Sequence, residues 1–107
     1  MARAKRPPRA RSIARKAVRF DEKLARARSR LLDLEPGGTR ARPLEISTPS
    51  LVEPKARAVR CPRCDEPFDV ESHEARSDAH GPLREARLRC RQCGTRRSLW
   101  FRVIAPS

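Results

Sequence analysis

Two short cysteine motifs decide the fold of this chain: residues 61–64, CPRC, and residues 90–94, CRQCG. They contain all four cysteines of the 107-residue sequence. Two C-x2-C motifs separated by a long insert are typical of a zinc site, because each motif offers two thiolates to one ion at about 2.3 Å. We therefore predict that one structural Zn²⁺ ion is bound by these thiolates: Cys61, Cys64, Cys90 and Cys93. A redox dithiol and an iron-containing site of the rubredoxin kind are the alternatives.

A shell of four thiolates leaves no coordination position for water or substrate, which indicates a structural site rather than a catalytic one. The module around the cysteines is too small and too poor in apolar residues to be stable without metal. Zinc binding at small sites is worth on the order of 10 to 16 kcal/mol and is coupled to folding. Gly94 follows the second motif, where a positive φ is expected. We expect His73 and His80 to be exposed loop residues and not ligands.

Alternating apolar residues predict three strands in this module, over residues 67–70, 83–89 and 96–104. Residues 71–82 are polar, and we expect an irregular excursion there. Phe68 and Val70 are predicted to point inward; Ala86 and Leu88 share one face of the second strand, and Leu99, Phe101 and Val103 share one face of the third. The predicted fold is a small metal-stabilised β module, a three-stranded antiparallel zinc ribbon over residues 58–104.

The residues before the ribbon divide into three segments. Residues 1–11 are basic and contain two prolines, which predicts a disordered tail. Residues 12–35 predict a basic amphipathic helix with Ser12 as its N-cap, ended by Pro36 and the glycines after it. Residues 36–57 are rich in proline and predict a disordered linker with at most a short strand at residues 44–46.

The predicted helix carries apolar residues at alternating spacings of four and three: Ile13, Ala17, Phe20, Leu24, Ala27, Leu31 and Leu34. This spacing is that of an a/d seam, and arginines and lysines occupy much of the remaining surface. Three interpretations stay open at this point. The helix is solvated and docks loosely on its own ribbon, or it becomes ordered on nucleic acid, or it uses the seam to bind a partner or a second copy.

The positive charge lies mainly in the N-terminal third of the chain. The formal net charge is +13; residues 1–34 carry 12 Lys and Arg against 3 Asp and Glu, whereas residues 61–107 carry 9 against 7. Such a basic segment attracts polyanions, of which nucleic acid is the commonest in a cell. No apolar run approaches the ~18 residues of a membrane span. Thiols spaced for metal favour a reducing compartment, and we expect the cytoplasm.

A second candidate surface lies on the ribbon. Trp100 is expected on one strand face with Arg102, near further arginines, as in platforms on which single-stranded bases stack. The competing interpretation is that Trp100 covers the small core together with Ile104 or the insert. The candidate nucleic-acid-binding residues are Arg15, Lys16, Arg19, Lys23, Arg26, Arg87, Arg89, Arg96, Trp100 and Arg102.

Over residues 58–104 the chain resembles the zinc-ribbon family, which has a C-x2-C turn, a long insert and a C-x2-C-G turn, each followed by a strand. It is most similar to the ribbons of transcript-cleavage elongation factors and small RNA polymerase subunits, and to uncharacterised bacterial ribbons. Residues 76–78, Arg-Ser-Asp, are similar to the family's loop, where Arg-Ser precedes two adjacent acids that hold a catalytic magnesium. Here Ala79 replaces the second acid, so the resemblance implies a fold and not cleavage activity.

We therefore expect a non-enzymatic zinc protein that binds DNA, RNA or a ribonucleoprotein or transcription assembly through its basic arm and ribbon face. The alternative is a protein-interaction adaptor that uses the ribbon or the helix seam. A nuclease would need a paired acidic metal site, which the sequence does not offer. No membrane and no small-molecule substrate is expected as a partner.

Overall fold

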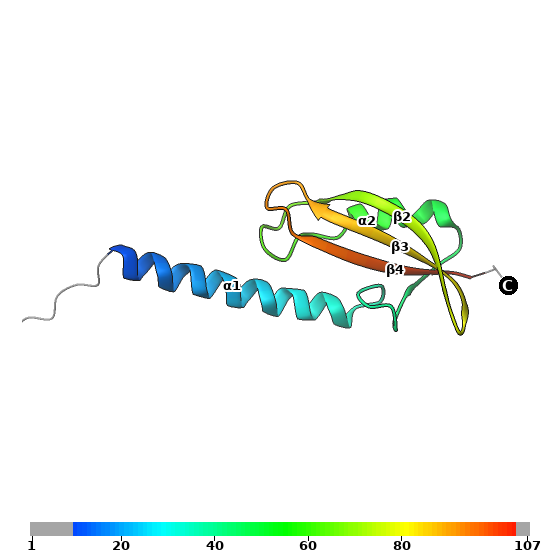
Figure 1. Ribbon diagram of the computed structural model, residues 1–107, viewed down its shortest axis with the longest axis horizontal. Coiled ribbons are helices and arrows are strands. Elements are labelled where there is room, and N and C mark those ends of the chain that lie inside the picture. Colours follow the sequence, from blue (N-terminus) through cyan, green and yellow to red (C-terminus); the bar gives the residue numbers. More distant parts are fainter. Residues whose placement is uncertain (1–9, 105–107) are drawn as a thin grey trace, which may run out of the picture.

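A long helix precedes a small α/β body in the computed structural model of the protein, which describes residues 10–104 (Figure 1). The elements in chain order are α1 (Ala10–Leu34), β1 (Leu44–Ile46), the 3-10 helix η1 (Pro49–Leu51), α2 (Val52–Arg57), β2 (Phe68–Asp78), β3 (Gly81–Cys90) and β4 (Arg96–Val103). Residues 1–9 of the predicted disordered tail lie outside the described part. The last two residues of that predicted tail, 10 and 11, belong to α1 instead.

Helix α1 is continuous over 25 residues and ends at Leu34, one residue before the predicted end. It begins before Ser12, so the predicted N-cap lies inside the helix. Two contacts tie its C-terminal end to the body. The Arg42 guanidinium donates a hydrogen bond to the Leu34 carbonyl at 2.8 Å, and Asp33 forms an ion pair with Arg97 at 2.8 Å. Helix α1 is therefore anchored at one end and extends away from the sheet (Figure 1).

Gly37 makes the turn that brings the chain from α1 to the sheet. Its φ is 90°, a conformation that glycine adopts without steric cost. Its carbonyl accepts a hydrogen bond from the Trp100 amide at 2.9 Å, and its amide donates to the Arg42 carbonyl. A Cβ atom at this position would lie 3.2 Å from the Trp100 carbonyl oxygen. Glycine is thus required both for the turn and for the close approach to β4.

The four strands form one mixed sheet in the order β1-β4-β3-β2. Strands β2, β3 and β4 are antiparallel neighbours, whereas β1 pairs with β4 in parallel. The three antiparallel strands predicted for residues 58–104 are confirmed, but the sheet has a fourth, parallel strand that the prediction lacked. The fourth strand comes from the segment predicted as a linker, because Leu44 and Ile46 bring an apolar face and pair with the edge that β4 would otherwise leave open.

Residues 71–82, predicted as an irregular excursion, continue β2 and β3 to the tip of a long hairpin. The strands stay paired as far as Asp78 and Gly81, with one irregularity between Val70 and Ser72. Sequence periodicity missed these strands because their side chains are polar on both faces. Cross-strand ion pairs, such as Arg76 with Glu85 at 3.2 Å, take the place of apolar packing.

The predicted disorder of residues 36–57 is wrong for η1 and α2 as well as for β1. Thr48 caps η1 by accepting a hydrogen bond from the Ser50 amide at 3.4 Å. Helix α2 then packs against β2 and β3, and two residues one turn apart, Val52 and Ala56, are completely buried. A helix of six residues is too short to show a recognisable period, and Pro54 within it suggested a linker.

The core lies on one face of the sheet, under α2 and η1. Its buried members are Ile46, Val52, Ala56, Cys61, Phe68, Ala86, Leu88, Cys90, Leu99 and Phe101. Phe68, predicted to point inward, is among them, and Val70, also predicted inward, is half-buried at the margin. Ala86 and Leu88 of β3 and Leu99 and Phe101 of β4 show which face of each strand is buried, and Val103 is half-buried beside them. Since Cys61 and Cys90 belong to the same cluster, the two cysteine turns and the core form one continuous packed unit.

We predict that Val52→Ala lowers the free energy of unfolding by about 2 kcal/mol, because the lost methyl groups leave a cavity under α2. The neighbouring exposed residue supplies the control: Glu53→Ala should change stability by less than about 0.5 kcal/mol. Urea unfolding of the zinc-loaded protein, followed by the fluorescence of the single tryptophan, measures both. Equal stability of the two variants would contradict the packing of α2 on the sheet.

Candidate metal centre

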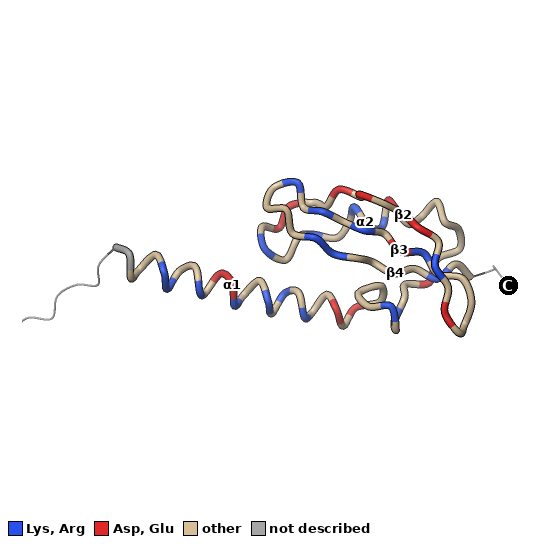
Figure 2. The backbone as a smooth tube through the Cα atoms, in the orientation of Figure 1, with Lys and Arg blue, Asp and Glu red and all other residues tan. Residues whose placement is uncertain are grey.

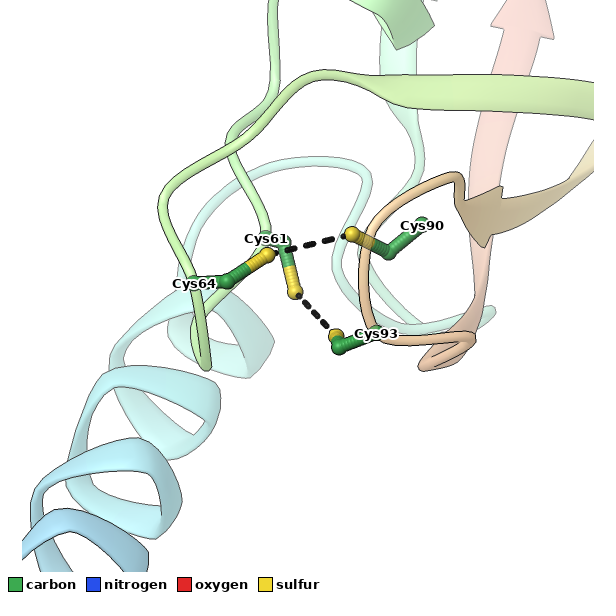
Figure 3. Close-up of side chains that lie close together, drawn as sticks. All are labelled: Cys61, Cys64, Cys90 and Cys93. Atoms are coloured by element: carbon green, nitrogen blue, oxygen red, sulfur yellow. Dashed lines mark hydrogen bonds between the residues drawn. The ribbon is translucent and has the colours of Figure 1, made fainter.

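The four cysteine side chains point toward one another from the two loops that carry the motifs (Figure 3). All four Sγ atoms lie within 4.8 Å of one another. The Sγ–Sγ distance is 3.6 Å between Cys61 and Cys93 and 3.2 Å between Cys64 and Cys90. A disulfide requires about 2.05 Å, whereas a tetrahedron of sulfurs around zinc has edges of about 3.8 Å. The cluster is therefore compatible with one bound metal ion such as zinc.

The two motifs adopt the same turn. In each, the amide of the residue after the second cysteine donates to the carbonyl of the first cysteine at 2.9 Å, Asp65 to Cys61 and Gly94 to Cys90. Asp65 and Gly94 are both in the left-handed region, with φ of 61° and 76°. Positive φ at Gly94 confirms the expectation for that position. Aspartate fills the equivalent position because its short polar side chain tolerates this region better than most.

Burial differs systematically between the first and second cysteine of each motif. The first cysteines, Cys61 and Cys90, are 2 % and 1 % exposed and belong to the core, whereas Cys64 is half-buried and Cys93 is exposed. An ion bound by these cysteines would be held to the packed core by Cys61 and Cys90, and Cys64 and Cys93 would hold it on the side that faces solvent.

Hydrogen bonds around the cysteine side chains shift the pKa values of Cys64 and Cys93 in opposite directions. Sharing of a proton with the Cys90 sulfur raises the pKa of Cys64 to about 12. Hydrogen bonding to the Thr95 side chain and then to its backbone amide lowers the pKa of Cys93 to about 6. Only part of the cluster is therefore deprotonated near neutrality. A bound cation would supply the charge that allows all four thiols to lose their protons, and binding would release those protons.

Neither histidine belongs to the ligand cluster. His80 is exposed at the tip of the β2–β3 hairpin, as expected for a loop residue. His73 was predicted in a loop but lies on β2, half-buried, opposite Ala86 of β3. The hairpin extends away from the cysteines, which is why both imidazoles are unable to join the ligand set.

The predicted nucleic-acid-binding arginines of the sheet are mostly engaged with carboxylates. Arg87 pairs with Glu85 at 3.6 Å, and Arg96 pairs with Glu71 at 3.7 Å. Within the described residues Arg89 has no such partner, and its side chain is exposed. The acidic first half of the module thus neutralises much of the basic second half across the sheet.

The strongest of these pairs closes the hairpin tip. Arg102 donates to the Asp78 carboxylate at 2.7 Å, and this bond is the main cause of the lowered pKa of Asp78. The two side chains are both largely shielded from solvent, at 17 % and 23 % exposure. Asp78 thus serves as the counter-ion of Arg102.

Trp100 lies on the sheet face opposite the core cluster, paired in register with the buried Glu85 of β3. The Arg40 guanidinium covers its ring at 5.4 Å from the centroid, which is a cation–π distance. Arg40 also donates to the Ser77 carbonyl at 2.6 Å. The indole therefore does not cover the core, and one face of its ring already has a cationic neighbour.

The five candidate residues of α1 are all exposed: Arg15, Lys16, Arg19, Lys23 and Arg26. At roughly 100° of rotation per residue they fall, with Arg30, within about 100° of the helix surface. We call these six residues the basic face of α1. Figure 2 shows the basic residues distributed along the length of the helix. None of them forms an ion pair with another described residue, in contrast to the arginines of the sheet.

Comparison of the chain with protein-family models, with curated proteins and with solved structures finds no match in any of the three. The structure itself defines the class: a small α/β protein with a long N-terminal helix, a four-stranded mixed sheet and a four-cysteine cluster consistent with a zinc-ribbon-like site. Over residues 10–104, no helix has the length and apolar character needed to cross a membrane.

We predict that the zinc-loaded protein contains one equivalent of zinc and that a strong chelator unfolds residues 58–104. The chelator removes the ion that the two cysteine turns share, and the remaining core is too small to hold the turns together. Elemental analysis gives the stoichiometry, and far-UV circular dichroism follows the sheet. Addition of zinc to the chelated protein should restore the spectrum. Retention of sheet structure in excess chelator would contradict this prediction.

We also predict that Gly94→Ala destabilises the zinc-bound protein by roughly 1 to 2 kcal/mol, since an L side chain resists this φ. The added Cβ would meet no atom within 4 Å, so the effect is purely conformational. Asp65→Gly at the equivalent position should not destabilise the protein, because it removes the same conformational cost. Urea midpoints in the presence of zinc test both changes. Unaltered stability of Gly94→Ala would show that the positive φ at this position does not require glycine.

Proposed function

We propose that this protein is a non-enzymatic zinc-binding protein that binds nucleic acid through the basic face of α1, with the ribbon as its metal-dependent scaffold. One observation carries the proposal: the cations of α1 are exposed and lack carboxylate partners among the described residues, whereas most sheet arginines are paired. Uncompensated charge on one side of a helix is the arrangement that attracts a phosphate backbone.

The metal is proposed to be zinc because four thiolates in a tetrahedral set are typical of structural zinc sites. An iron site of the rubredoxin kind would use the same ligands. A redox role suits the cluster less well, since the first cysteine of each motif is buried in the core and reactive cysteines are accessible. A closed shell would stabilise the fold and take no part in chemistry.

The absence of enzymatic activity is also a proposal, and the state of Asp78 supports it. The family to which the ribbon is similar uses two adjacent carboxylates to hold magnesium. In this chain Asp78 is bound to Arg102 at 2.7 Å, and the next residue is Ala79. A carboxylate engaged with a guanidinium, with no second acid beside it, is a poor ligand for a divalent cation.

Contacts from the basic face would be made mainly to phosphates and would carry little sequence information. Six phosphate contacts give a slope of log K against log salt of about −5 on double-stranded DNA. The sheet would add less, because Arg87, Arg96 and Arg102 are committed to carboxylates. Arg89 and the half-buried Trp100 would be secondary contacts for an unpaired base.

The test is binding of labelled duplex DNA and single-stranded RNA, measured by fluorescence anisotropy over a range of salt concentrations. The triple variant R19A/K23A/R26A should bind at least about tenfold more weakly, and its salt slope should fall by about 3 units. The matched control K55A/R57A/R63A removes three exposed cations from the body of the protein, and it should lose less than about threefold.

Two outcomes would overturn the proposal. Equal losses for the two triple variants would show that binding depends on total charge and not on the basic face. No binding at low salt would favour the adaptor alternative, in which the charge of α1 serves solubility and the protein acts through protein contacts.

A further inference from the structure

Helix α1 exposes an apolar stripe along its whole described length. Four large residues of the seam are more than half exposed: Ile13 at 56 %, Phe20 at 66 %, Leu31 at 63 % and Leu34 at 66 %. Leu24, in the middle of the seam, is also exposed. An isolated helix is marginal in water, and most helices in proteins gain their stability by burying such a stripe. The body of the protein does not cover this one.

The geometry of the anchor explains why the seam is uncovered. At its C-terminal end α1 is held to the body by Leu32 and Asp33. Leu32 lines a small cavity with Leu99 and Phe101 of the sheet, and Asp33 binds Arg97. With about 100° of rotation per residue around the helix axis, the mean direction of Leu32 and Asp33 lies about 160° from the centre of the seam. The seam therefore faces away from the sheet, where a second molecule has free access.

We propose that a second copy of this chain covers the seam, and that the two α1 helices form a parallel two-stranded coiled coil. In heptad notation the a positions are Ala17, Leu24 and Leu31, and the d positions are Ile13, Phe20, Ala27 and Leu34. A stripe that repeats every 3.5 residues is the pattern for which a second helix of the same kind is the natural partner. The two ribbons would lie on the outside of the dimer.

The charges that flank the seam select the parallel orientation. The g positions Lys16, Lys23 and Arg30 are all basic. In a parallel pair each g residue faces the e residue five positions later. Lys16 then faces the partner's Asp21, an attractive pair, whereas Glu35, at the position that Arg30 would face, lies beyond the end of α1. Lys23 faces the partner's Arg28, which is the one repulsive pair.

An antiparallel pair would set g positions against g positions, so that only Lys and Arg would meet across that side of the seam. Like charges facing one another destabilise such an interface. The charge pattern thus disfavours the antiparallel pair.

Dimerisation would leave half of the basic face available. Lys16, Lys23 and Arg30 flank the seam at the g positions, whereas Arg15, Arg19 and Arg26 lie farther from it, so each helix of the pair would still present these last three residues. Two linked faces on one polyanion would bind more tightly than either alone. The dimer does not depend on the proposed nucleic-acid binding, and the following tests are carried out without nucleic acid.

The first test is sedimentation equilibrium of the zinc-loaded full chain after nuclease treatment and in high salt. We expect a monomer–dimer equilibrium, and Leu31→Asp should raise the dissociation constant by at least about tenfold because it places a carboxylate in the seam. The matched control is Val18→Asp, which changes an equally exposed apolar residue, 55 % exposed, on the far side of α1. It should leave the constant within about threefold.

A wild-type protein that stays monomeric at all concentrations would overturn the proposal. An equal effect of Leu31→Asp and Val18→Asp would also overturn it, since it would show that helix stability and not the seam controls association. Circular dichroism of both variants distinguishes a loss of helix from a loss of the seam contact. The two variants can be compared directly, because both place an aspartate in α1.

A second pair of variants tests the orientation. In the parallel dimer Lys16→Glu faces the partner's Asp21 and should weaken association by several fold. In an antiparallel dimer the same change would face the partner's Arg30 and strengthen it. Arg15→Glu makes the same charge change one residue away from the interface and should have little effect. Tighter association of Lys16→Glu would refute the parallel arrangement while leaving the seam contact in place.

Discussion

The convergence of four cysteine sulfurs within 4.8 Å is the constraint on which the rest of the body depends. It joins two loops that are separated by the whole β2–β3 hairpin and fixes the start of β4 relative to the end of β3. Cys61 and Cys90 belong to the same packed cluster as Phe68 and Phe101, so the ligand set and the apolar core stabilise each other. A module of this size has little apolar surface to bury, and a metal ion would supply the missing free energy.

Charge pairing divides the molecule into two electrostatic regions. Across the sheet, arginines of β3 and β4 meet acids of β2 and β3, and Glu85 is buried between Arg76 and Ser98, with which it forms hydrogen bonds at 3.2 and 2.7 Å. On α1 the described cations form no ion pair with a described carboxylate. The net charge of the chain thus overstates the basic character of the ribbon. The positive charge that has no carboxylate partner in an ion pair lies mainly on α1.

Helix α1 combines two surfaces with different chemistry. The basic face and the apolar seam are neighbours on the same helix, and the anchor through Leu32 and Asp33 uses neither of them. A helix that only served to support the ribbon would turn its apolar residues toward it. The anchor instead presents both surfaces to other molecules, which is consistent with the proposed binding of a polyanion and of a second copy.

The sequence by itself determined the four clustered cysteines, the long helix that ends within one residue of Leu34, the positive φ at Gly94 and the alternation of the last strand, with Leu99 and Phe101 on one face. These features are local, because cysteine spacing, helical period and strand alternation are each written in a few neighbouring residues. Only the tertiary structure decided the parallel pairing of β1 with β4, the burial of Val52 under α2 and the continuation of the polar hairpin to Asp78. Each of these depends on a partner far along the chain: the open edge of β4, the apolar face of the sheet, or an opposite charge on the next strand. No short segment contains that information.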